Sequence, residues 1–134
     1  MLKIAQIVID RFKADGAPVN FVEAGGDVLL EIPFKGMNAV LDFSGDNGEY
    51  LSLSLIIDSV PEDKQMDVII ACNTMNSMFK WLKFCVDKDN EVMARDDAIL
   101  AESNAFEETM ELMLRAFSIV TQVKPAIMRV IYGS

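Results

Sequence analysis

Acidic side chains are the first candidates for chemistry in this sequence, because 21 of its 134 residues are aspartate or glutamate. Two carboxylates held close together could act as general acid and base or bind a metal ion. Three pairs of acids are adjacent in the chain: Glu62 with Asp63, Asp96 with Asp97, and Glu107 with Glu108. Neighbouring side chains diverge on a helix and on a strand, so these pairs are typical of a solvated surface.

The chain lacks the residues that nucleophilic catalysis and phosphate binding usually need. The chain has no histidine, which removes the common general base, the commonest metal ligand, and the Ser-His and Cys-His systems. Ser52 and Ser54 therefore have no base of the right type. The glycines of residues 25–26 and 45–48 lie between expected strands, with no helix start after them to receive a phosphate.

One acidic segment resembles the start of a calcium loop. Asp87 and Asp89 have the right spacing, but Val92 stands where the loop needs glycine and Ala98 where it needs glutamate. The segment is therefore expected to be a hairpin. The sequence predicts no metal, no cofactor and no enzymatic activity, and an acid-lined metal hydrolase is the least favoured alternative.

Composition narrows the class of protein further. A chain of 134 residues predicts one domain, residues 1–134. The net charge of −9 is opposite to the basic footprint that nucleic-acid binding needs. Cys72 and Cys85 lie in apolar stretches and are expected to be reduced core residues. No signal peptide or membrane-length apolar run is evident, so a cytoplasmic location is expected.

Hydrophobic periodicity predicts the elements that would position any site. Apolar residues recur with helical spacing in residues 2–13, 62–78 and 103–131. They alternate with polar residues from residue 19 and over residues 28–34, 37–43, 49–57, 82–86 and 92–100. Short turns between these strands require antiparallel neighbours. The expected fold is α+β, with an antiparallel sheet of about six strands packed against helices in the order α-β-β-β-β-α-β-β-α.

Four local features refine this expectation. Pro33 predicts an edge or a bulge in its strand, because proline cannot donate to a ladder. Pro125 predicts a kink or a break in the last helix. Asn104, with Ser103 as the other choice, is expected to cap that helix, and Glu107 stands in the capping-box position.

The two later helices hold the candidate contact residues. Nine methionines occur in the chain, and those on these helices include Met66, Met75, Met78, Met110 and Met113. Such methionines either fill an ordinary core or form an adaptable binding surface. The stripe of helix 62–78 runs through Met66, Ile69 or Ile70, and Asn73. Asn73 and Asn76 either cap the end of that helix and bind the following turn, or anchor a partner backbone.

The order of elements resembles that of the YbjN-like proteins, small bacterial proteins labelled as sensory transduction regulators. The matching pieces are the strand Tyr50-Leu-Ser-Leu-Ser-Leu, the helix end Cys72-Asn-Thr-Met-Asn76, and the strand pair Lys83-Phe-Cys-Val-Asp87 and Asp89-Asn90-Glu91-Val92. This resemblance implies a fold like that of the type III secretion chaperones. It also implies a bacterial cytoplasmic protein that acts through protein contacts. It supplies no catalytic residues.

Two functions follow from these observations. The leading hypothesis is a non-catalytic regulatory or chaperone-like module, a homodimer that binds a segment of another protein. Its expected contact residues are Asn73, Asn76, Trp81, Met110, Met113 and Phe117. The alternative is a domain that holds a small apolar ligand between the sheet and the long C-terminal helix. Such a pocket would be lined by Phe34, Phe43, Trp81, Met113 and Phe117.

Overall fold

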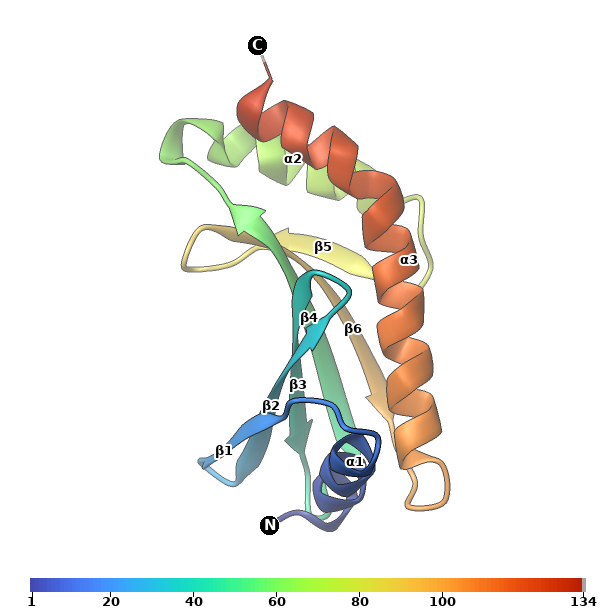
Figure 1. The fold of residues 1–134 in the computed structure, drawn as a ribbon. Coiled ribbons are helices and arrows are strands. Elements are labelled where there is room, and N and C mark those ends of the chain that lie inside the picture. Colours follow the sequence, from blue (N-terminus) through green and yellow to red (C-terminus); the bar gives the residue numbers. More distant parts are fainter. Residues whose placement is uncertain (134) are drawn as a thin grey trace.

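A six-stranded antiparallel sheet organises the computed structural model, which describes residues 1–133 (Figure 1). Its spatial order is β1-β2-β3-β4-β6-β5, so β1 and β5 are the two edges. The strands are β1 (Asn20–Ala24), β2 (Asp27–Phe34), β3 (Met37–Ser44), β4 (Tyr50–Ser59), β5 (Lys83–Val86) and β6 (Glu91–Ile99).

Three α-helices complete the fold. They are α1 (Lys3–Ala14), α2 (Gln65–Asn76) and α3 (Ala105–Tyr132), and a single 3-10 turn, η1 (Glu62–Lys64), precedes α2. The predicted element order and the α+β class are confirmed. None of the helices within residues 1–133 is long and apolar enough to cross a membrane.

The core lies between one face of the sheet and the helices. Alternate residues of β4 are buried, as the pattern of residues 49–57 predicted, and α1 and α3 pack together over that face (Figure 1). The largest fully buried side chains include Phe43, Leu53, Phe84 and Met113. The opposite face, which we call the open face, carries the intervening residues of each strand.

The two prolines lie where backbone geometry tolerates them. The register of β1 with β2 ends at Asn20 and Glu31, so Pro33 lies beyond the last residue that β1 pairs with. Pro125 lies inside α3, and the helix continues through it to Tyr132 without a break. Figure 1 shows the C-terminal part of α3 bent towards α2, which agrees with the predicted kink.

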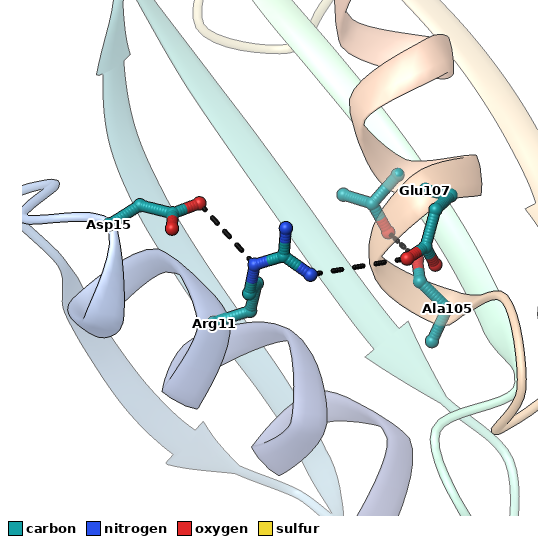
Figure 2. Close-up of polar contacts among 5 residues, drawn as sticks. Arg11, Asp15, Ala105 and Glu107 are labelled. Carbon is teal, nitrogen blue, oxygen red and sulfur yellow. Dashed lines mark hydrogen bonds and ion pairs between the residues drawn. The ribbon is translucent and has the colours of Figure 1, made fainter.

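The predicted capping box at the start of α3 is wrong. Asn104 is the N-cap residue, but its side chain makes no capping bond to α3. Instead its Oδ1 accepts from the N–H of Ala101 at 3.1 Å and closes the preceding turn. Glu107 faces the Arg11 guanidinium at 4.0 Å, so its carboxylate is directed towards α1 (Figure 2).

Arg11 and an aromatic pair join α1 to α3. Phe12 and Phe106 meet edge to face with their ring centroids 5.1 Å apart, and the Arg11 guanidinium lies 4.5 Å from the Phe106 ring centroid. Figure 2 shows Arg11 between Asp15 and Glu107. These two ion pairs are exposed and contribute little stability, so the aromatic packing is the main link between the helices.

Candidate protein-binding surface on α2

Helix α2 is apolar on two opposite faces. Val68, Cys72 and Met75 form one stripe and are buried against the rest of the fold. Met66, Ile69 and Ile70 form a second stripe, and their exposed fractions are 66%, 42% and 58%. Globular helices normally expose polar residues on the face opposite the core. The second stripe of α2 therefore has the apolar composition of a buried face, but nothing within residues 1–133 covers it.

Helical spacing predicted Met66, Ile69 or Ile70, and Asn73 as the apolar stripe of this helix, but in the structure the stripe that faces the core is the other one. Together with Asn73, the exposed Met66, Ile69 and Ile70 define what we call the α2 surface. The sequence could not separate this stripe from the one buried through Val68, because both have helical spacing. Two further exposed apolar side chains, Met78 and Trp81, follow the end of the helix.

A shallow depression borders the α2 surface where the helix meets β5. It has a volume of about 330 Å³ and is lined by Ile69, Cys72, Asn73, Asn76, Phe84, Cys85 and Val86. The depression thus joins the exposed stripe of α2 to the edge strand of the sheet.

The two asparagines of α2 have different surroundings. The Asn76 side chain accepts from the N–H of Phe84 at 2.6 Å and donates to the Phe84 carbonyl at 3.0 Å. The Asn76 side chain therefore pairs with the backbone N–H and C=O groups of Phe84 on the outer side of β5. The sequence had offered a bond to the turn after α2 as one role of this asparagine. Asn73 is exposed on the α2 surface beside the depression. Lys83 completes the junction by donating to the carbonyls of Asn76 and Phe79.

The remaining expected contact residues do not gather with the asparagines. Trp81 is exposed, and its ring centroid lies 4.8 Å from the Arg115 guanidinium. Met113 is fully buried in the core and is not available to a partner, while Met110 is half-buried. Phe117 packs edge to face on Phe34 with ring centroids 5.8 Å apart.

The space required for the alternative apolar pocket is filled. Phe43 and Met113 are completely buried, and the contact between Phe34 and Phe117 occupies the region between sheet and α3. On the surface of residues 1–133, the depressions along β1 to β3, at β4 and β6, near the N-terminus, and between α2 and β5 include no residue of α3. The packing therefore does not favour a small-molecule site at this interface.

The cysteines offer no reactive thiolate. Burial, together with a smaller effect of the neighbouring Cys85, raises the pKa of the Cys72 thiol to about 11. Burial also raises the pKa of Cys85. Both cysteines are free, Cys72 is buried as expected and Cys85 is half-buried. Near neutral pH both remain protonated thiols, which are weak nucleophiles.

Three acids of the hairpin between β5 and β6 come together. One carboxylate oxygen from each of Asp87, Asp89 and Glu91 lies within 4.8 Å of the others. One oxygen of Asp87 accepts from the N–H groups of Asp89 and Glu91, each at 2.9 Å. These bonds close the turn, which is the hairpin that the sequence predicted.

The open face of residues 1–133 carries a carboxylate with one unpartnered oxygen, that of Asp42. In the register of the sheet, Asp42 lies between Leu29 of β2 and Ser52 of β4. Its Oδ1 is buried and has no hydrogen-bond partner within residues 1–133. Burial raises the pKa of Asp42, the nearby Asp27 raises it further, and Arg95 partly opposes both effects.

Replacing Asp42 with asparagine is expected to stabilise the fold at pH 7. A carboxyl whose pKa is raised in the folded state binds its proton more tightly there than in the unfolded chain. Stability is therefore lost as the pH rises from the ordinary carboxyl value of 3.8 through the raised pKa of Asp42. The gain from Asp42→Asn should be present at pH 7 and absent below that ordinary value.

Urea denaturation at several pH values measures this gain. Glu111→Gln is the matched control, because Glu111 is exposed on α3 and the variant removes the same charge. An equal gain from Glu111→Gln would assign the effect to overall charge repulsion. A gain for Asp42→Asn that persists at the lowest pH would show that the protonation of Asp42 is not its cause.

Comparison with known proteins identifies the fold. The sequence matches no protein-family model and no curated protein. The structure is similar to the crystal structure of YbjN from E. coli, which is described as a candidate transcription regulator. The similarity covers 98% of this chain and 92% of that chain, with a TM-score of 0.59 and 15% sequence identity. The chain therefore has the YbjN-like α+β fold, which the resemblance of its sequence implied.

Proposed function

We propose that this protein is a non-catalytic protein-binding module of a bacterial cytoplasm that forms a homodimer through the α2 surface. The observation that carries the proposal is the apolar character of α2 on both faces, one buried and one exposed. Exposed apolar patches of this kind are typical of protein interfaces.

The absence of charge on most of α2 allows a second copy of the chain to occupy the α2 surface. Two copies that each carry a net charge of −9 repel one another wherever acids face acids. Residues 68–79 contain no charged side chain, so they offer a neutral region where two copies can meet. In a two-fold dimer each α2 would pack its stripe against the same stripe of the partner.

The proposal of a non-catalytic role rests on chemistry that the chain does not offer. The sequence has no histidine, and both thiols are protonated near neutral pH. A protein partner is favoured over nucleic acid because the net charge is −9. A regulatory role agrees with the description of the structural neighbour as a candidate transcription regulator.

The molecular mass in solution tests the proposed dimer. Light scattering over a range of concentrations is expected to give twice the chain mass for the unmodified protein. Ile70→Asp places a charge in the exposed stripe and should weaken dimerisation at least ~30-fold, equivalent to about 2 kcal/mol. Because Ile70 is 58% exposed, the variant should keep its fold, which circular dichroism would verify.

Leu114→Asp provides the matched control. Leu114 is an exposed leucine on α3 with an exposed fraction of 46%, so it receives the same charge outside the α2 surface. The proposal predicts an unchanged dimer for this variant. A monomer at every concentration, or a dimer that Ile70→Asp and Leu114→Asp affect equally, would refute the assignment to α2.

A further inference from the structure

The outer side of β1 is the uncovered edge of the sheet. At the other edge, α2 packs against β5, and Asn76 binds the backbone of Phe84. All five residues of β1 are exposed, and Figure 1 shows β1 at the side of the sheet away from α2. An edge strand presents unpaired N–H and C=O groups that can bind another extended chain.

An apolar depression adjoins this edge on the open face. It has a volume of about 280 Å³ and is lined by Asn20, Phe21, Val22, Leu29, Glu31 and Val40. A strand added beside β1 would lie about 4.8 Å from it. Its side chains on the open face would then lie next to Val22 and could enter the depression.

The acids around this depression form no ion pairs within residues 1–133. Asp27, Glu31 and Asp42 lie on the open face of β2 and β3, as the strand register shows. The buried Oδ1 of Asp42 also lacks a hydrogen-bond partner within this range.

We infer that the β1 edge binds an extended peptide segment that carries lysine or arginine beside apolar side chains. The backbone of the segment would pair with β1 as a seventh strand. An apolar side chain would enter the depression beside Val22. A basic side chain is long enough to cross β1 and reach Glu31, where a charge-assisted hydrogen bond forms. A second copy of the chain fits this edge poorly, since its acids would face these acids.

This inference deepens the proposed function, because it names the class of partner that the protein-binding module recognises. It uses the edge of the sheet opposite to the α2 surface. The two can therefore fail separately: Ile70→Asp should weaken the dimer and still bind the peptide. Loss of peptide binding with an intact dimer would refute the β1 site and leave the proposed dimer in place.

Fluorescence anisotropy with a labelled octapeptide tests the inference. The sequence Thr-Lys-Thr-Val-Thr-Lys-Thr-Val places lysine and valine on one side of an extended strand. The peptide is expected to bind, and Glu31→Lys should weaken binding by about tenfold or more, equivalent to about 1.4 kcal/mol. Glu111→Lys makes the same charge change on α3 and should alter binding by less than about twofold.

Three modified peptides separate strand addition from charge attraction. Replacing both lysines with glutamate should abolish binding. Two peptides N-methylated on alternate residues, one in each phase, block one hydrogen-bonding edge each, so one of them should lose binding. Equal binding of the lysine and glutamate peptides, full binding by both methylated peptides, or equal loss in Glu31→Lys and Glu111→Lys would each overturn the inference. So would the absence of binding to the unmodified protein.

Discussion

Replacing Arg115 with methionine is expected to lower the free energy of unfolding by about 3 kcal/mol. Arg115 Nη2 lies 2.8 Å from Asp96 Oδ2, and the side chain of Asp96 is only 5% exposed. The arginine is the ion-pair partner of this buried carboxylate. Methionine fills similar space but leaves the charge of Asp96 uncompensated, which is the costly outcome. Urea denaturation at pH 7 measures the loss.

A double-mutant cycle separates lost charge from lost packing. Arg115 also stacks on Trp81, so Arg115→Met removes both contacts. In an Asp96→Leu background no carboxylate remains, and Arg115→Met should then cost less than about 1 kcal/mol. An equal cost in both backgrounds would assign the effect to packing on Trp81 and contradict the role of the ion pair.

Most of the fold could be predicted from the local spacing of apolar residues. The strict alternation of residues 49–57 identifies one buried face, and β4 has that face in the structure. Helix α3 follows from sustained helical spacing over residues 105–132, which outweighs the effect of Pro125. These elements are predictable because each buries a single face, so the periodicity of the sequence has one interpretation.

The predictions from sequence are wrong where contacts with residues distant in the sequence determine the position of a side chain. Asn104 and Glu107 have the spacing of a capping box, but the side chain of Asn104 closes a turn and Arg11 is the neighbour of Glu107. Arg11 is distant in sequence, so no local pattern contains this contact. Met113 has the same type and helical spacing as a surface methionine, yet it is fully buried.

The candidate surfaces were only partly visible in the sequence for a related reason. Of the α2 surface only Asn73 was expected to be a contact residue, because two apolar stripes share this helix and only packing decides which is exposed. The β1 edge depends on strand order, because its exposure requires that no strand or helix lies beyond it. Strand order is a property of the whole sheet, and no residue of β1 encodes it.

Asn76→Ala is expected to lower the free energy of unfolding by about 2 kcal/mol. The substitution leaves the N–H and C=O of Phe84 without their partner in a partly buried position. Since Asn76 also holds the end of α2 against β5, the depression beside the α2 surface should open. Hydrogen exchange measures the loss of the bond between Asn76 and Phe84, because the amide of Phe84 should then lose its protection first.

Asn73→Ala is the matched control and tests the other role that the sequence allowed. Asn73 is exposed on the α2 surface, so its loss should change the free energy of unfolding by less than about 0.5 kcal/mol. If Asn73 contacts a second copy, the same variant should weaken the dimer while Phe84 stays protected. Equal destabilisation by both variants would contradict the separation of the two roles. The pair thus assigns one asparagine to the fold and the other to the interface by independent measurements.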